Sequence, residues 1–259
     1  MTDISELGFA SDEAKEFEGH IQKNFADVFN LSDQLSSLFI KSLSKSKIDA
    51  SSRDNMLLNA AAARTLELFQ SVDLLLRRGC IPAAMVLLRS QIEAVYKLCA
   101  MVKDPELIEE LVRQSSATRP SKLKSVQKYR QKHQVEKGAK PNVVKEIAEL
   151  AKNKVSKLRP EQWAEWSEMQ DFHNVYYQGL NDEVHSNIES YNQYFDKNNN
   201  YDFTYGPNVS DLKMVAHGSQ RAIINSLAHY QLHIGLDDSG EIRKIGEAVD
   251  LVFYEEKKS

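Results

Sequence analysis

The chain has little of the glycine, proline and cysteine that mark turn-rich or disulfide-stapled proteins. Its 259 residues include 10 glycines, 6 prolines and 2 cysteines. With so few breakers, the long stretches rich in Ala, Leu, Glu, Lys and Gln favour helix over an all-β pattern. Cys80 and Cys99 both lie in or beside apolar helical sequence, where a thiol behaves as a small hydrophobe. We therefore predict an all-α protein without disulfides.

Several catalytic motifs are also absent from the sequence. It has no glycine-rich phosphate loop, no H-E-x-x-H, no Cys/His spacing for a metal and no G-x-S-x-G turn. These absences exclude the commoner enzyme classes, and we expect neither a cofactor nor a metal. The first ten residues are mixed and acidic and lack the apolar run of a signal peptide, so the expected location is cytoplasmic.

The stretch Ile81–Met101 predicts a central helix that other helices enclose. Pro82 suits a first helical turn, and apolar residues then lie on almost every face, whereas a surface helix would show one stripe. A second helix is predicted from about 53 to 78 and ends at Gly79. The connection is so short that the two helices, about 53–78 and 82–102, should pack as an antiparallel hairpin.

Two charged residues interrupt the central helix one turn apart. Arg89 and Glu93 lie on the same face, each flanked by large aliphatic residues. This spacing brings their side chains together and predicts a largely buried ion pair. Ionised groups near a bilayer centre are costly, so the pair also argues against a membrane span.

The rest of the chain predicts one helical domain, 1–259, arranged around this hairpin. Apolar residues from Phe17 to Phe39 form one long stripe, and aromatic residues from Trp163 to Tyr176 at helical spacing are more typical of a core than of a ligand platform. We expect an N-terminal helix from Ser11, a connector at 41–54 and a short helix to about Thr118. A basic insertion at about 119–159 follows, which Pro120, Gly138 and Pro141 divide into two helical pieces at about 121–133 and 143–158. The remaining expected elements are a helix from Pro160 to Tyr177, a loop at 191–209 with a short extended piece, and C-terminal helices at 210–259.

Charge is distributed unevenly along the chain, whose net charge is −4. Between Arg119 and Arg159, 13 Lys or Arg stand against three acidic residues, which gives this segment +10 and leaves −14 for the rest. A basic segment of this kind indicates a polyanionic partner such as RNA. The alternative is a solvated helical excursion whose charges meet acidic neighbours. The candidate nucleic-acid-binding residues are Lys122, Lys124, Lys128, Arg130 and Lys132.

The candidate for chemistry is the stretch Y-Q-G-L-N-D-E-V-H from Tyr177 to His185. It places Asn181, Asp182 and His185 close together after a glycine break. Histidine can titrate near neutral pH and so can act as a general acid or base. A helix-start cap with a structural histidine explains the same residues, and the residues alone favour this structural interpretation.

Three short motifs carry a resemblance to known proteins. The combination of A-R-T-L-E-L, L-L-R-S-Q-I-E-A and Y-x-x-L-N-D-E-V-H-S, between Arg53 and Asn187, resembles an uncharacterised family of bacterial helical proteins. More distantly it is similar to the HEPN superfamily of helical bundles from toxin–antitoxin and phage-defence systems. That resemblance implies an RNA-binding protein, and many members cleave RNA without a metal.

The chain departs from the HEPN pattern at its arginine. The family's motif has an Arg followed after four to six residues by a His, often with an Asn directly after the Arg. Asn181 and His185 match, but Leu180 occupies the arginine position. Leucine cannot stabilise the charge that develops on a scissile phosphate. The resemblance then implies either lost activity or a rearranged site that an arginine from another helix, Arg89 or Arg64, completes.

Two functional hypotheses follow. The first is a HEPN-like helical protein of bacterial defence or toxin–antitoxin type that binds RNA, and that cleaves it without a metal if its site is complete. In such a site His185 would be the acid or base and Arg89 the phosphate partner. Asn181, Asp182 and Glu93 would complete it. The second is a non-catalytic, dimeric interaction module in which Arg89, Glu93 and His185 form a buried network that fixes helix register. A small-molecule sensor with a pocket between helices is a third, to which no particular residue points.

Overall fold

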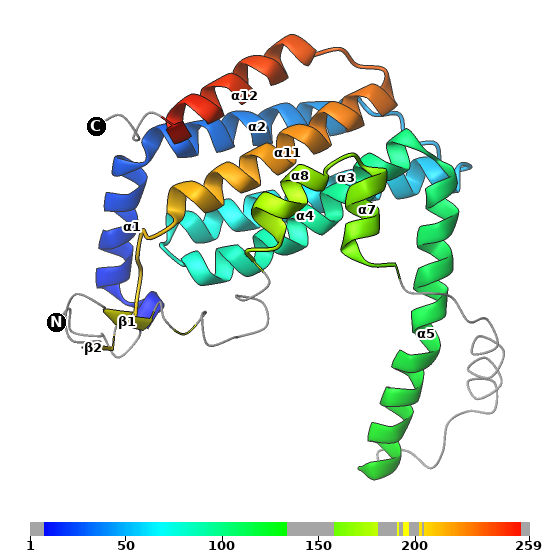
Figure 1. Ribbon diagram of the computed structural model, residues 1–259, viewed down its shortest axis with the longest axis horizontal. Helices are drawn as coiled ribbons and strands as arrows, with labels where there is room; N and C mark the ends of the chain where they lie inside the picture. The colour runs from blue at the N-terminus through cyan, green and yellow to red at the C-terminus, as the bar shows by residue number, and fades with distance from the viewer. Residues whose placement is uncertain are drawn as a thin grey trace.

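The computed structural model describes residues 8–133, 158–180, 191, 194–196, 202–203 and 205–254. They form a bundle of helices from which one long helix projects (Figure 1). The elements are η1 (Gly8–Ala10), α1 (Asp12–Asn24), α2 (Ala26–Lys45), α3 (Arg53–Arg77), α4 (Ile81–Lys103), α5 (Glu106–Lys132), α7 (Pro160–Trp166), α8 (Gln170–Phe172), the π-helical turn η2 (His173–Tyr177), the strands β1 (Phe195–Asp196) and β2 (Asp202–Phe203), α11 (Leu212–Ile234) and α12 (Ser239–Tyr254).

The predicted all-α architecture is confirmed. The strands are a two-residue antiparallel pair, with Phe195 opposite Phe203, inside the predicted 191–209 loop. None of the helices in the described part of the chain combines the length and apolar character that a membrane span requires.

The predicted hairpin of α3 and α4 forms the middle of the bundle. Ser52 caps α3 by accepting a hydrogen bond from the Asn55 N–H at 3.3 Å. At the other end Gly79 adopts a left-handed φ of 68°, and the Cys80 and Gly79 N–H groups bond back to the carbonyls of Leu75 and Leu76. This Schellman arrangement stops α3 and lets α4 begin two residues later.

Helix α11 completes the core by lying against α2, α3, α4 and α12 (Figure 1). Residues on most of its faces are buried, including Ser219, Gln220 and Gln231. Ser219 Oγ donates to Gln91 Oε1 of α4 at 2.7 Å, and Gln91 Nε2 donates to the Ser219 carbonyl at 2.9 Å. Buried polar groups are costly without partners, so these bonds hold the two helices at one register. Three further contacts are Gln220 to Ser32 (3.0 Å), Gln231 to Ser42 (2.9 Å) and Tyr230 to Asn59 (2.6 Å).

The prediction of one long N-terminal helix from the apolar stripe is wrong, because the stripe is divided between two helices, α1 and α2. The chain changes direction at Phe25, whose φ of −117° and ψ of 30° separate α1 from α2. The change lets Ile21 of α1 lie beside the hairpin turn at Gly79 while Val28 and Phe29 of α2 face the core. A stripe that continues in phase across one non-helical residue does not reveal such a bend. Helix α2 also continues to Lys45, so the connector is shorter than predicted.

The predicted division of the basic segment at Pro120 is also wrong, because α5 continues through it to Lys132. A proline removes one hydrogen bond from the helical ladder, and the turns on either side keep theirs. One long helix therefore replaces the predicted short helix to Thr118 and the first predicted piece of the basic insertion. The second predicted piece, at 143–158, lies almost entirely outside the described residues.

The helix expected from Pro160 to Tyr177 is interrupted in the middle. Glu168 has a left-handed φ of 57°, and the N–H groups of Met169 and Glu168 bond to the carbonyls of Ala164 and Glu165. This is again a Schellman ending, here without glycine. Lys103 at the end of α4 pairs with Glu168 at 2.5 Å, which ties the turn to the central helix.

We expect Gly79→Ala to lower the free energy of unfolding by about 1–3 kcal/mol, because a side chain is strained at this φ. An added Cβ would also lie 2.9 Å from the Asn208 carbonyl oxygen. Gly19→Ala is the matched control: nothing lies within 4 Å of its added Cβ inside α1, so alanine should raise stability by up to about 1 kcal/mol. Urea denaturation measures both; unchanged stability of Gly79→Ala would contradict the strained turn.

Candidate functional site

The predicted pair of Arg89 and Glu93 is present on α4. Arg89 Nη1 lies 3.2 Å from Glu93 Oε1, and the two side chains are 20% and 28% exposed. They are therefore mostly buried, as the flanking aliphatic residues indicate. The pair lies on a face of α4 other than the one that Gln91 presents to α11.

Tyr177 of the π-helical turn η2 joins this pair from outside α4. Its hydroxyl donates to Glu93 Oε1 at 2.7 Å, and its ring lies 4.7 Å from the guanidinium carbon of Arg89. A cation over an aromatic face is stabilised by the ring quadrupole. Burial raises the pKa of Tyr177, and the bond to Glu93 raises it further. The phenol therefore remains a hydrogen-bond donor at neutral pH.

A histidine and a second tyrosine lie behind Tyr177. The His173 ring stacks on Tyr177 with a centroid distance of 4.7 Å, and the buried Tyr96 ring lies 6.0 Å from His173. Within the described residues, the Tyr96 hydroxyl and His173 Nδ1 have no hydrogen-bond partner. Burial raises the pKa of Tyr96. The aromatic residues of this segment thus pack into the core, as their spacing predicts.

The other predicted catalytic residues, Asn181, Asp182 and His185, lie outside the described residues. Leu180, which stands where the HEPN motif has arginine, is described and is 3% exposed within the core. An apolar residue suits that environment, whereas an arginine there would bury a charge. The structure therefore gives Leu180 a packing role.

The geometry around Arg89 bears on what this cluster can do. Its guanidinium charge already faces the Glu93 carboxylate and the Tyr177 ring. A phosphate would have to compete with a carboxylate bonded to both partners. The arrangement is therefore that of a polar connection between α4 and η2 more than of an open anion site.

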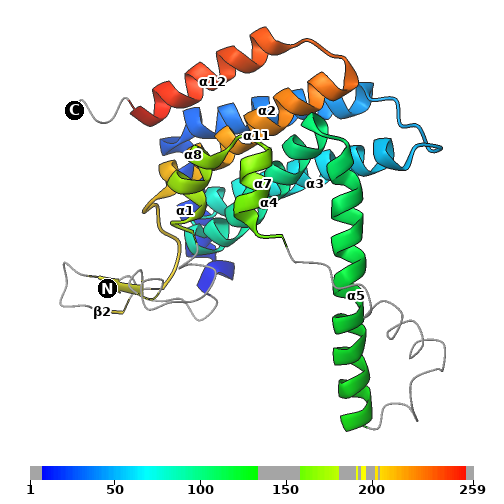
Figure 2. The same ribbon diagram turned by 45° about the vertical axis from the view of Figure 1, so that its right-hand side comes forward.

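The predicted nucleic-acid-binding residues all lie on α5. This helix extends well beyond the bundle, as both views show (Figures 1 and 2). Lys128 and Lys132 are exposed on its distal part, with Tyr129 and His133 beside them. Lys122, Lys124 and Arg130 belong to the same helix, but their side chains are outside what the structure describes.

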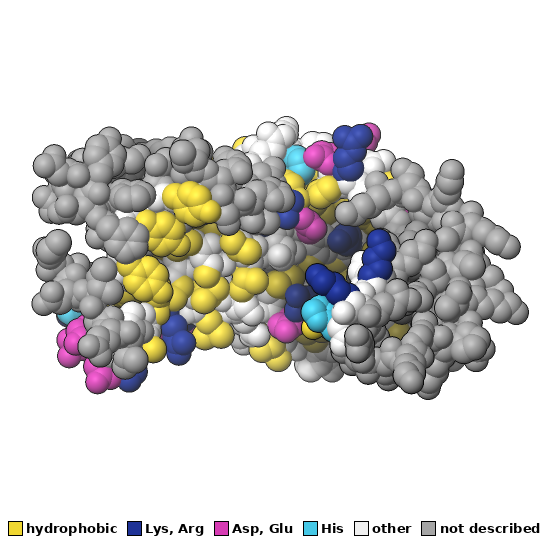
Figure 3. Space-filling model, turned by 90° about the horizontal axis from the view of Figure 1, so that it is seen from below, with side chains coloured by type: hydrophobic (Ala, Val, Ile, Leu, Met, Phe, Trp, Pro, Cys, Tyr) yellow, Lys and Arg dark blue, Asp and Glu magenta, His cyan; other side chains and the backbone are white. Residues whose placement is uncertain are grey.

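The face of the molecule seen from below carries both charged and hydrophobic side chains. Figure 3 shows Lys and Arg side chains, with Asp and Glu beside them, in the right-hand half of the lower face and a band of hydrophobic side chains in the left-hand half.

A hydrogen-bonded relay that the sequence did not indicate joins three elements. The Tyr176 hydroxyl lies 2.6 Å from His217 Nδ1, and His217 Nε2 lies 3.0 Å from Asp250 Oδ1. Burial lowers the pKa of His217 despite the neighbouring Asp250, which favours a neutral ring that accepts from Tyr176 and donates to Asp250. Residues so far apart in the chain give no motif, so only the folded structure brings them together.

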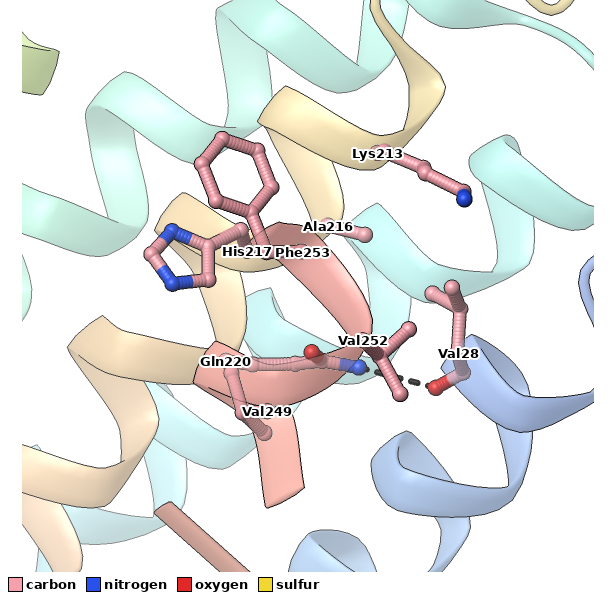
Figure 4. A pocket seen from close by; sticks show the side chains of 8 residues that line it. All are labelled: Val28, Lys213, Ala216, His217, Gln220, Val249, Val252 and Phe253. Atoms are coloured by element: carbon pink, nitrogen blue, oxygen red, sulfur yellow. Dashed lines mark hydrogen bonds between the residues drawn. The ribbon is translucent and has the colours of Figure 1, made fainter. Parts of the chain in front are cut away.

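The hydroxyl, imidazole and carboxylate of the relay stand in the order that activates a nucleophilic hydroxyl in many enzymes. The environment of Tyr176 and His217 opposes such an activation. Burial raises the pKa of Tyr176, so its hydroxyl stays protonated. His217 and Phe253, whose rings stack at 4.1 Å, line a hollow between α2, α11 and α12 (Figure 4). Its volume of about 10 Å³ has room for no more than about one water molecule, since a cavity needs roughly 10–15 Å³ to hold one. The relay therefore anchors α12, and this hollow is too small for the sensor hypothesis.

The fold and these sites define a helical-bundle protein with a projecting basic helix. The model of a family described as "Family of unknown function (DUF5677)" matches residues 55–202, more than half of the chain, so the chain belongs to this family. No curated protein and no solved structure matches it. The matched range contains the Arg89 cluster and α5, whereas His217 and Asp250 lie beyond it.

We expect Arg89→Ala to lower the free energy of unfolding by about 1–3 kcal/mol, because it leaves a mostly buried carboxylate with only the Tyr177 bond. Replacing the cluster together, as Arg89→Leu, Glu93→Met and Tyr177→Phe, should cost less, since no buried polar group remains unpaired.

Arg64→Ala is the control for this series. Arg64 pairs with Glu67 on the helix surface, where the side chains are 58% and 65% exposed, so its loss should change stability by less than about 1 kcal/mol. Guanidinium denaturation of the three variants measures the differences. Equal losses for Arg89→Ala and Arg64→Ala would show that burial of the Arg89 pair has no energetic consequence.

Proposed function

We propose that this protein binds RNA through α5, as a HEPN-like helical protein of bacterial defence or toxin–antitoxin type. The observation that carries the proposal is the placement of basic residues on a helix that stands away from the bundle (Figure 2). A charge run that only solvates a bundle face would lie against that bundle. Here Lys128 and Lys132 are exposed on the projecting part of α5 and accessible to a phosphate backbone.

The +10 charge between Arg119 and Arg159 supports the same proposal. Cations that neutralise phosphates release condensed counterions, which drives association and makes it sensitive to salt. The resemblance of the motifs to those of HEPN proteins indicates that the polyanion is RNA. The two arguments are independent, since one rests on charge and the other on the stretch that ends at His185.

We propose binding without cleavage. His185 is the candidate acid or base, but the arginine position of the motif holds a core residue, Leu180, and Arg89 is engaged by Glu93 and Tyr177. Arg64, the other candidate arginine, pairs with Glu67 on the surface of α3. Transition-state charge on a phosphate would then have no free guanidinium from any of these positions.

A second candidate function, a dimeric interaction module, has one observation in its favour. The lower face carries a band of hydrophobic side chains (Figure 3), and exposed apolar surface of this kind marks many interaction sites. The exposed rings of Phe9 and Tyr205 are in edge-to-face contact 5.4 Å apart. Sedimentation velocity distinguishes this candidate: a concentration-dependent dimer supports it, and a monomer at all concentrations removes it.

Affinity for RNA is expected to fall steeply with salt. Changing Lys122, Lys124, Lys128, Arg130 and Lys132 together to Gln should reduce the slope of log affinity against log salt by up to about 3.5, at roughly 0.7 for each single-strand phosphate contact. Fluorescence anisotropy with a labelled RNA at several salt concentrations measures the slope, and circular dichroism checks that the bundle remains folded.

The matched control removes the same charge elsewhere. Five exposed lysines outside α5 are changed to Gln: Lys15, Lys23, Lys41, Lys45 and Lys244. If binding depends on α5 and not on total charge, this variant retains most of the slope. Equal losses in both variants, or no binding by the wild type at low salt, would contradict the proposal.

A ribonuclease assay in EDTA tests the absence of cleavage. We expect the wild type and His185→Ala to leave a labelled RNA equally intact. Metal-independent cleavage that His185→Ala abolishes would overturn this part of the proposal and show that a rearranged site is complete.

A further inference from the structure

The distal part of α5 carries an exposed aromatic pair within its basic surface. Tyr129 is 62% exposed, and its ring centroid lies 4.4 Å from that of His133, one turn further along. Both belong to the part of the helix that extends from the bundle (Figure 1). Packing against the bundle therefore does not account for the tyrosine.

Cations accompany this pair on the neighbouring row of the helix. Lys128 precedes Tyr129, Lys132 precedes His133, and both lysines are exposed. Positions one turn apart form a row along a helix, with a rise of about 6 Å for four residues. Two rows therefore run side by side, one cationic and one aromatic.

We propose that this double row recognises unpaired bases, so that the ligand of α5 is single-stranded RNA in preference to duplex RNA. The inference rests on the proposed function and adds a substrate class to it. Base stacking on an aromatic side chain combined with cations along the backbone is the general means of binding single strands. Tyr129 offers the stacking face, and Lys128 and Lys132 contact the adjacent phosphates.

Duplex RNA does not fit the aromatic row in the same way. Its bases are paired and stacked on one another, and the deep, narrow major groove of the A-form helix hides their edges from side chains. An exposed ring on a lone helix can contact the phosphates and sugars of a duplex but cannot stack on its bases. The lysines can therefore act on both ligands, whereas Tyr129 acts on the single strand alone.

A purely structural role for Tyr129 makes a different prediction. Aromatic pairs one turn apart slightly stabilise an isolated helix. Tyr129→Leu keeps a good helix former at the position and removes the stacking face, while Tyr129→Phe keeps the face and removes only the hydroxyl. Comparing these two variants separates helix stability from base stacking, with far-ultraviolet circular dichroism as the check on α5.

The experiment uses the full chain and two labelled RNAs. One is a mixed-sequence single strand of about 12 nucleotides, a length within the range that known single-strand modules bind. The other is the blunt duplex of the same strand. We expect the wild type to prefer the single strand. Tyr129→Leu should weaken single-strand binding by about 5- to 150-fold, the range for loss of one stacked base, and Tyr129→Phe should change it little. Neither variant should alter duplex binding.

A 2-aminopurine placed in the single strand gives a direct readout of stacking. Its fluorescence should change on binding to wild type and Tyr129→Phe, and that change should be lost with Tyr129→Leu at saturating protein. If single strand and duplex bind alike and Tyr129→Leu has no effect, the single-strand inference fails while RNA binding through α5 stands. If neither RNA binds at low salt, both the inference and the proposed function fail.

Discussion

The reciprocal hydrogen bonds between Gln91 and Ser219 are the contact on which the arrangement of the bundle depends. They join α4 to α11 inside the core, where an unpaired amide or hydroxyl would cost about 1–3 kcal/mol. Apolar surfaces alone tolerate small sliding movements of one helix along another. A polar pair with defined donors and acceptors permits one register, and the contacts of α11 with α2 and α3 extend that constraint across the bundle.

Once α4 is held in place, it positions both features that bear on function. A second face of α4 presents Arg89 and Glu93 to Tyr177, so the same helix is bonded to α11 and to η2. Its C-terminal end leads through a tight turn, in which the Glu106 N–H donates to Asp104 Oδ1 at 3.0 Å, directly into α5. The projecting helix thus follows the central helix of the core after a two-residue turn, and this connection sets where the proposed RNA-binding residues lie.

The candidate site divides into what local spacing reveals and what it does not. Arg89 and Glu93 could be paired from sequence because a helix brings residues four apart together. Tyr177 could not be added, since its position depends on the break at Glu168 and on the π-helical turn that follows. His173 lies beside the cluster for the same reason. The relay of Tyr176, His217 and Asp250 joins three separate elements, and no periodicity connects them.

The sequence by itself determined the all-α class, the hairpin of α3 and α4 with its glycine stop, the Arg89–Glu93 pair and the basic character of α5. Each of these depends on interactions within one or two helical turns, or on composition. Only the tertiary structure decided that α11 lies inside the bundle, that the N-terminal stripe bends at Phe25, and that α5 continues past Pro120 and projects from the bundle. Those outcomes depend on which surfaces meet across long separations in the chain, and local propensity carries no information about such contacts.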